Sequence, residues 1–167
     1  MKYLYCVLFF FTFLLNSFSQ ERKIIEAYRF QVPPKIDGIF SEKEWKKIIP
    51  ATNFTLFQPE NRSGEKIPQG YETFVYFGYD DTAIYVAAQL NHPDPKNIPS
   101  EFSERDEMDA ISEKFLVSID TYDNTKERFT FFVTSSGGLI DGLNTGDFEE
   151  EGLKFNTLFD AKVQKNI

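Results

Sequence analysis

Short runs in which apolar and polar side chains alternate constrain the fold of this chain most. From residue 72 onward, apolar or aromatic residues recur at every second position, and turn-forming clusters such as Asp80-Asp81-Thr82 and Ser135-Ser136-Gly137-Gly138 separate the runs. A period of two is that of a strand with one buried face. The runs lie at 74–79, 84–90, 115–119, 129–133, 139–140 and 159–163. The pattern predicts an all-β chain, namely an antiparallel β-sandwich that is jelly-roll-like.

The residues before this region add one strand and one short N-terminal helix to the prediction. Residues 28–32 alternate as a first strand, and the two prolines that follow end it. Ser41 precedes Glu44 by three positions, which is the spacing of a capping box at the start of a helix. This helix is expected to carry Trp45 into the core and to stop before Pro50.

Residues 1–19 have the pattern of a cleavable export signal. A positive start and an apolar run precede Ser17 and Ser19, the small residues that a signal peptidase requires, so the cut is expected before Gln20. The alternative is a membrane anchor, but a spanning helix needs about 20 apolar residues and this run is shorter. We therefore expect an exported protein whose mature part, residues 20–167, is one β-sandwich domain. Because the sequence stops directly after a strand pattern, we expect this domain to be truncated at its C-terminus.

The charge and the missing residue types exclude several classes of function. Without the signal the chain carries 17 Lys and Arg against 26 Asp and Glu, a net charge of −9. Phosphate backbones would be repelled, so nucleic acid is excluded as a partner. The only cysteine, Cys6, lies in the signal, and His92 is the only histidine, which excludes an internal zinc site and a His-based or Cys-based catalytic site. Since no other catalytic constellation stands out, we expect a protein that is not an enzyme.

Several short motifs follow one another along the mature chain, and their order and spacing resemble the family-9-like carbohydrate-binding module. The form they resemble is the one found at the N-terminus of larger exported bacterial proteins, and the resemblance covers roughly residues 33 to 163. The matching pieces are Pro33-Pro34-Lys35-Ile36-Asp37-Gly38 with Glu44-Trp45, Thr52-Asn53-Phe54 with Gln58-Pro59 and Gly64, the run 79–88, Asp94-Pro95, Arg105-Asp106, the run 117–123, Gly137-Gly138 and Asp141-Gly142.

The resemblance implies a β-sandwich that serves as a non-catalytic carbohydrate-binding module of an exported polysaccharide-handling protein. Such a protein would be periplasmic, associated with the outer membrane or extracellular. Close relatives of this form continue into a region that looks like an outer-membrane β-barrel, so a barrel is the expected partner or covalent C-terminal neighbour. Sugar-binding members hold a pyranose between two Trp rings, whereas Trp45 is the only tryptophan here, so Phe or Tyr would have to replace that clamp. The rival interpretation is a structural or interaction sandwich attached to an outer-membrane protein, without sugar binding.

Arg105 and Asp106, in the polar connection between two predicted strands, are the first candidates for a sugar site. Loops of this kind usually carry the function of a sandwich. A guanidinium donates a planar pair of hydrogen bonds to neighbouring hydroxyls, and a carboxylate accepts from them. The candidates for a stacking ring are Phe102 in the same connection and Phe57 or Tyr71 in the earlier loop. The alternative is that Arg105 only holds its own loop by an ion pair. Its partners would then be Glu104, Asp106 or Asp109.

Four aspartates could supply oxygen donors for a structural calcium ion, which modules resembling this one bind. Calcium takes about six to eight oxygen ligands, often from one loop and a neighbouring one. The candidate ligands are Asp106, Asp109, Asp120 and Asp123, with Asn124 beside the last. The alternative is turn formation, because Asp123-Asn124 is favourable turn chemistry and residues 120–124 lack the spacing of a defined calcium loop.

Overall fold

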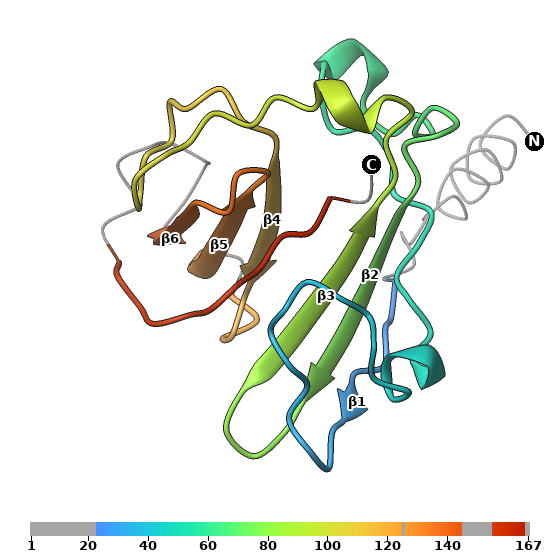
Figure 1. Cartoon of the computed structure of the whole chain (residues 1–167), viewed down its shortest axis with the longest axis vertical. Coiled ribbons are helices and arrows are strands. Elements are labelled where there is room, and N and C mark those ends of the chain that lie inside the picture. The colour runs from blue at the N-terminus through green and yellow to red at the C-terminus, as the bar shows by residue number, and fades with distance from the viewer. Residues whose placement is uncertain (1–22, 125, 145–154, 166–167) are drawn as a thin grey trace, which may run out of the picture.

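A computed structural model describes residues 23–124, 126–144 and 155–165. Its strands form two three-stranded sheets, in the orders β1-β2-β3 and β4-β5-β6 (Figure 1). The predicted all-β sandwich class is confirmed, and no α-helix occurs in the described ranges. None of the helical turns there is long and apolar enough to cross a membrane. The predicted export signal, residues 1–19, lies outside the described residues.

Five strands coincide with alternating runs of the sequence, and each neighbouring pair among them within a sheet is antiparallel. These strands are β2 (Thr73–Tyr79), β3 (Ile84–Leu90), β4 (Lys114–Ile119), β5 (Arg128–Thr134) and β6 (Leu139–Asn144). The remaining elements are the short strand β1 (Tyr28–Arg29) and the 3-10 turns η1 (Trp45–Lys47), η2 (Glu60–Arg62) and η3 (Pro95–Asn97).

The core of the first sheet is a cluster of aromatic rings. Phe30, Trp45 and Ile48 are buried at its centre. The ring of Phe30 meets Trp45 edge to face at a centroid distance of 4.9 Å and meets Tyr85 at 5.6 Å. Trp45 is only 5% exposed, which confirms its predicted place in the core. The partly buried side chains around this cluster are Tyr28, Phe40, Tyr76, Tyr85 and Ala87.

Gly78 in β2 makes room for the aromatic cluster. A Cβ atom at this position would lie 2.2 Å from Cε2 of Phe30 and 3.0 Å from the carbonyl oxygen of Tyr28. The main chain fixes Phe30 over the glycine, because its N–H donates to the carbonyl of Tyr79 at 2.8 Å. Any side chain at position 78 would therefore displace the ring or the strand.

Apolar side chains lie on both faces of the second sheet, and one face carries the rows predicted from the alternation. The register places Val117 of β4 opposite Phe131 of β5, and Ile119 opposite Phe129. Directly opposed residues of an antiparallel pair point to the same side of the sheet. This face is therefore apolar along β4 and β5, as the alternation predicts, while β6 adds Asp141 to it.

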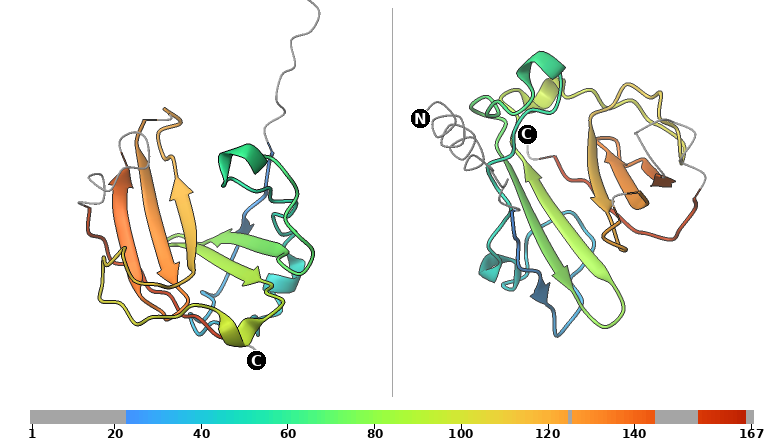
Figure 2. Two further views of the ribbon diagram at one scale, coloured as in Figure 1. Left: turned by 90° about the horizontal axis from the view of Figure 1, so that it is seen from above. Right: turned by 180° about the vertical axis from the view of Figure 1, so that it is seen from behind.

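Residues 155–165 run along that apolar face and then leave it. Phe155 packs edge to face on Phe129 at 5.2 Å, and Phe159 packs on Phe131 at 5.3 Å. The segment then ends between the two sheets (Figures 1 and 2). There it lies against the turn at Gly38, where an added Cβ would be 3.2 Å from the main-chain nitrogen of Gln164. The segment thus connects the second sheet to the N-terminal half of the chain.

The predicted N-terminal helix is only one 3-10 turn, η1, and the predicted capping box is wrong. Glu44 occupies the N-cap position with helical angles and makes no side-chain cap hydrogen bond. The acceptor in this segment is Glu42, whose Oε1 takes the main-chain N–H of Lys35 at 3.0 Å. Packing explains the short turn, because Trp45 and Ile48 both enter the core and residues three apart share one side of a 3-10 turn.

The two outermost predicted strands also differ from the structure. β1 is two residues long and pairs with β2 in parallel, and Val32 beyond it is 75% exposed. Residues 159–163, predicted as a last strand, join no ladder, and no backbone–backbone hydrogen bond connects 155–165 to another described residue. Exposure still alternates along 155–160, which is the period that the strand prediction detected.

Candidate functional site

The connection between β3 and β4 contains a closed loop whose ends pair with each other. Glu101 donates its main-chain N–H to the carbonyl of Ile111 at 3.0 Å, and Glu113 donates to the carbonyl of Pro99 at 3.1 Å. Within this 99–113 loop, Phe102 is 83% exposed and Ile111 is 74% exposed. The loop therefore presents an aromatic ring to solvent from a fixed base, as expected for Phe102.

Arg105 leaves its own loop and pairs mainly with Asp141 of β6. Its Nη2 atom donates to Oδ1 of Asp141, which is fully buried, and to the carbonyl of Thr157 at 2.8 Å. Oδ2 of Asp141 accepts the main-chain N–H of Thr157 at 2.6 Å. The guanidinium also lies over the ring of Phe159, 5.6 Å from its centroid. We call this set of contacts among Arg105, Asp141 and Thr157 the clamp.

Asp106 completes the connection from the loop to β6. It has a left-handed backbone, with φ of 65°, and its N–H donates to the carbonyl of Leu139 at 3.0 Å. Its Oδ1 accepts the main-chain N–H of Asp141 at 3.3 Å. Its Oδ2 lies 3.6 Å from Nε of Arg105, which is an ion pair but too long for a hydrogen bond. A non-glycine residue in this backbone region is uncommon and needs such surrounding support.

The expectation that Arg105 pairs within its own loop is therefore only partly right. Asp106 is a partner at 3.6 Å, but the close partner, Asp141, was missed. The sequence did indicate that Asp141 is buried, because the alternation of β6 places it on the same inward face as Leu139 and Leu143. A buried carboxylate requires a cation or several hydrogen-bond donors.

Ser103 lies between Phe102 and Arg105 in the sequence of the loop. It is 5% exposed, and its hydroxyl has no hydrogen-bond partner among the described residues. A Cβ on Gly138 would overlap this hydroxyl, so the loop packs directly on the β5–β6 turn. Most buried hydroxyl groups have a hydrogen-bond partner, so the Ser103 hydroxyl is an exception in this loop.

The two other candidate rings belong to a different part of the chain. Phe57 is 75% exposed in the segment that contains η2, between β1 and β2 (Figure 1). Tyr71 is 40% exposed and packs edge to face on His92 at a centroid distance of 5.1 Å. No ring stacking, cation–π contact or hydrogen bond joins either of these two rings to Arg105 or Asp106. Only Phe102 shares a loop with the polar candidates.

The four aspartates expected to bind calcium do not form a group placed for a metal. In the part of the chain that the structure describes, no cluster of three or more His, Cys, Asp or Glu side chains could hold an ion. Oδ1 of Asp106 accepts the main-chain N–H of Asp141. Oδ1 of Asp120 accepts the N–H groups of Tyr122 and Asn124 in the β4–β5 turn. Asp123 has a φ of 49° in this turn, and Asp109 is exposed. Calcium binding stays a prediction, and identical melting curves in excess calcium and in chelator would contradict it.

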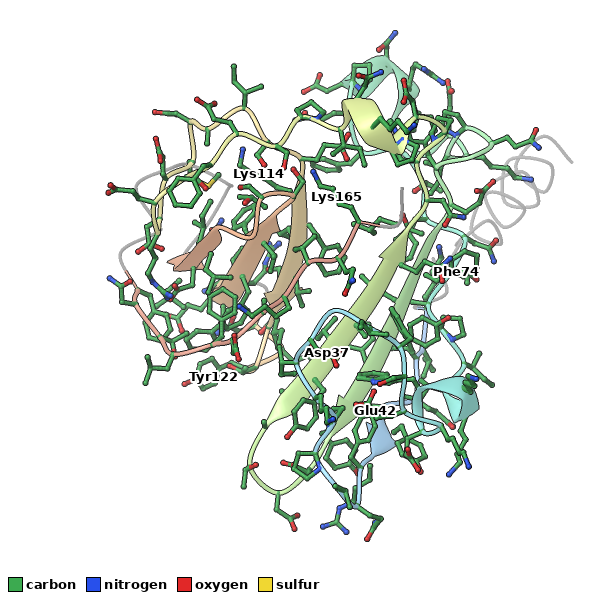
Figure 3. The ribbon with its side chains drawn as sticks, in the orientation of Figure 1. Asp37, Glu42, Phe74, Lys114, Tyr122 and Lys165 are labelled. Atoms are coloured by element: carbon green, nitrogen blue, oxygen red, sulfur yellow. The ribbon has the colours of Figure 1, made fainter. Side chains whose placement is uncertain are left out.

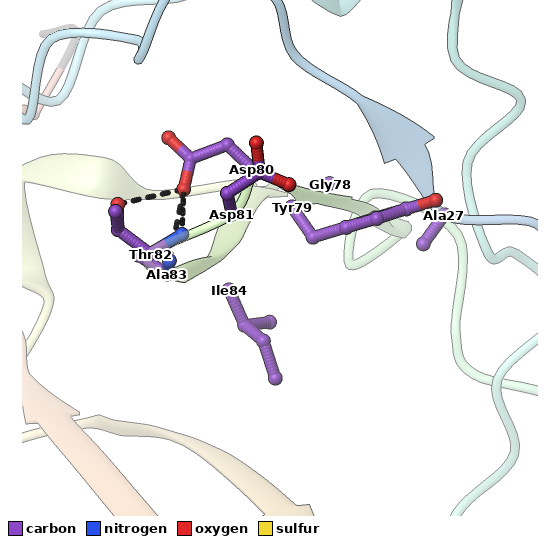
Figure 4. Close-up of a pocket in the computed structure, with 8 residues that line it drawn as sticks. All are labelled: Ala27, Gly78, Tyr79, Asp80, Asp81, Thr82, Ala83 and Ile84. Atoms are coloured by element: carbon purple, nitrogen blue, oxygen red, sulfur yellow. Dashed lines mark hydrogen bonds between the residues drawn. The ribbon is translucent and has the colours of Figure 1, made fainter.

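The motif Tyr79-Asp80-Asp81 lies at a shallow open depression formed by the β2–β3 turn (Figure 4). Asp80 closes the turn, because its Oδ1 accepts the N–H of Thr82 at 2.7 Å and its Oδ2 accepts the hydroxyl of Tyr85 at 2.7 Å. These hydrogen bonds, that from the Thr82 amide first, lower the pKa of Asp80 to about 2. The same hydroxyl bond raises the pKa of Tyr85. The depression is lined by Ala27, Gly78 and residues 79–84.

Asp81, the second acid of this motif, pairs with Arg29 of β1 at 2.6 Å. Both carboxylates of the motif therefore stabilise the fold: Asp80 closes the hairpin turn, and Asp81 connects β1 to it. This motif is one of the pieces that resemble the family, and its two aspartates have structural contacts that explain them. The depression offers no convergent set of polar groups for a ligand.

Comparison with models of protein families, with curated proteins and with solved structures finds no match for this chain.

Proposed function

We propose that this protein is a non-catalytic carbohydrate-binding module of an exported polysaccharide-handling protein, and that the 99–113 loop is its ligand site. One observation carries the proposal. The ring of Phe102 is 83% exposed in the same closed loop as Arg105 and Asp106, whose side chains are still 40% and 35% exposed. An exposed ring in one loop with a partly exposed guanidinium and carboxylate supplies the kinds of group that a pyranose needs.

The unused polar atoms of this loop suit sugar hydroxyls. Nη2 of Arg105 is engaged in the clamp, whereas Nη1 has no hydrogen-bond partner among the described residues. Oδ2 of Asp106 accepts no hydrogen bond there and is free to accept one from a ligand. In the proposed complex, the ring stacks on the apolar C–H face of the sugar, while one N–H donor and one carboxylate oxygen fix its orientation. The pair of Trp rings that holds the sugar in the modules this chain resembles is absent, so we expect a modest affinity for the sugar.

Phe102→Ala tests the proposal because it removes the ring without touching the clamp. A stacked ring contributes about 0.5–1.5 kcal/mol beyond its area burial, so the variant should bind soluble oligosaccharides about tenfold more weakly. The matched control is Tyr122→Ala, which removes a ring that is 67% exposed in the β4–β5 turn, at the other end of β4 (Figure 3). Calorimetric titration of the wild type and both variants gives the affinities, and melting curves establish that all three are folded.

The titrations and the glycan array can give three outcomes. A loss of affinity in Phe102→Ala alone supports the proposed site. Equal affinities for all three proteins place the sugar elsewhere, with Phe57 or Tyr71 as the next rings to replace. No binding of any glycan on an array by the wild type removes the carbohydrate function.

The second candidate function is a structural or interaction sandwich attached to an outer-membrane barrel. It is favoured by apolar side chains left exposed at the two ends of one face of the first sheet: Tyr79 opposes Ile84 at one end, and Leu90 lies at the other. Their exposed fractions are 41%, 63% and 52%. An exposed apolar pair such as Tyr79 and Ile84 is typical of surfaces that contact another protein. A domain of this kind would bind no glycan, so the array separates it from the first proposal.

A further inference from the structure

The clamp connects three parts of the chain that are distant in sequence. The 99–113 loop contributes Arg105, β6 contributes Asp141, and the 155–165 segment contributes both main-chain groups of Thr157. Asp141 is fully buried, and its two carboxylate oxygens serve different partners: Oδ1 takes the guanidinium and Oδ2 takes the Thr157 amide. Neither partner can leave without exposing an unmatched group on this carboxylate.

The clamp is also the main polar attachment of the 155–165 segment. No backbone–backbone hydrogen bond ties this segment to another described residue, and Leu158, next to Thr157, is completely exposed. The segment also packs through the rings of Phe155 and Phe159 on β5 and through Lys162 and Gln164 against the turn at Gly38, but its hydrogen bonds to other described residues come from the carbonyl and the N–H of Thr157. Seating of the segment and orientation of Arg105 therefore depend on the same carboxylate.

We propose that Asp141 is the positioning residue of the loop, and that docking of the 155–165 segment and ligand binding at Arg105 are coupled through it. With the segment docked, Nη2 of Arg105 is held between Asp141 and Thr157, which restricts the orientation of the guanidinium plane and therefore of Nη1. With the segment released, Arg105 keeps its charge but loses the carbonyl that completes that geometry. Two processes that share one ordered group stabilise each other by the same factor. The ligand side of this inference rests on the proposed function, whereas the segment side does not.

The segment side is tested by hydrogen exchange on the free protein. Asp141→Asn removes the charge that both partners use and keeps the shape of the side chain. The matched control is Asp160→Asn, the same change at an exposed position within the segment. A hydrogen bond to a charged group is worth enough that the Thr157 amide should exchange at least about tenfold faster in Asp141→Asn than in the wild type. The control should exchange like the wild type.

A second variant keeps the test decisive if Asp141→Asn does not fold. Arg105→Lys retains the positive charge but cannot place one planar nitrogen between the carboxylate and the Thr157 carbonyl. It should accelerate exchange in 155–165 while the urea midpoint of the Trp45 core stays near that of the wild type. Unchanged exchange in the segment for Arg105→Lys and for any folded Asp141→Asn would overturn the inference.

The ligand side uses an oligosaccharide that the wild type binds on the array. This ligand should slow exchange of the Thr157 amide in the wild type, and the folded clamp variant should bind it about tenfold more weakly. Binding that leaves exchange in the segment unchanged would overturn the coupling but not the carbohydrate function. Absence of any ligand would overturn the proposed function, while the exchange comparison still decides whether Asp141 holds the segment.

Discussion

Gly78→Ala adds a single methyl group, and the structure predicts that it strongly destabilises the fold. The added methyl would lie 2.2 Å from Cε2 and 2.8 Å from Cδ2 of Phe30, well inside contact distance for carbon atoms. Phe30 cannot turn aside freely, because it is 3% exposed and packs against Trp45 and Tyr85. Overpacking of a core costs about 1–3 kcal/mol, and expulsion of a core Phe costs about 3–5 kcal/mol. We therefore expect the free energy of unfolding to fall by about 3 kcal/mol.

Urea denaturation followed by tryptophan fluorescence measures this loss directly, since Trp45 is the only tryptophan and its ring meets Phe30 at 4.9 Å. With a urea dependence of about 2 kcal/mol per molar, the midpoint should fall by about 1.5 M. The control is Gly64→Ala, where a Cβ meets nothing within 4 Å and the φ of +87° is the only penalty. That backbone penalty is about 1–2 kcal/mol.

A double variant distinguishes the clash from other causes. In a Phe30→Leu background the obstructing ring is absent, so Gly78→Ala should cost much less than it does in the wild type. Equal costs in the two backgrounds, or a wild-type midpoint for Gly78→Ala alone, would show that the ring of Phe30 does not exclude a side chain at position 78.

Three further changes probe the core, the hairpin turn and the clamp. Trp45→Ala should lower the free energy of unfolding by about 3–5 kcal/mol, and an unchanged denaturant midpoint would contradict its place in the core. Asp80, with its pKa lowered from 3.8 to about 2, stabilises the hairpin fully above the ordinary value and loses this contribution as the pH falls through about 2. A carboxyl NMR titration with a midpoint near 4 would disprove that, and Asp80→Asn should lack this acid dependence. Arg105→Ala should lower the free energy of unfolding by about 1.5–3 kcal/mol, because it leaves Asp141 buried without its cation. If calorimetry finds the same melting temperature for this variant and the wild type, the clamp does not stabilise the fold.

The strands could be predicted because their cause is local. Alternation along β2 to β6 requires only that each strand bury one face, and the register of β4 with β5 follows from matching the apolar faces. The burial of Trp45 followed from a single large apolar residue among charged neighbours. The helix at 41–49 failed because the capping signal is local, whereas the main-chain partner of Glu42 and the core contacts of Ile48 are set by the fold.

The site was predicted only in part, and for the same reason. The pattern identified Arg105, Asp106 and Phe102 as neighbours in one loop, and the structure keeps them there. The decisive partner of Arg105 is 36 positions away, and Thr157 is 52 positions away. Pairing over such distances is not encoded in any spacing, although an aspartate at an inward position of a strand could have been recognised as requiring a cation.

Strand β3 leaves one edge without a partner strand in the described part of the chain, since β2 covers only its other side. Its seven residues, IYVAAQL, include no proline and no charged side chain, the two features that usually protect such an edge from other chains. An edge of this kind can pair with the edge of another chain through main-chain hydrogen bonds that need no specific side chain. Purification and titration are best done across a dilution series. A lysine at Leu90, which is 52% exposed, is the simplest gatekeeper against that association.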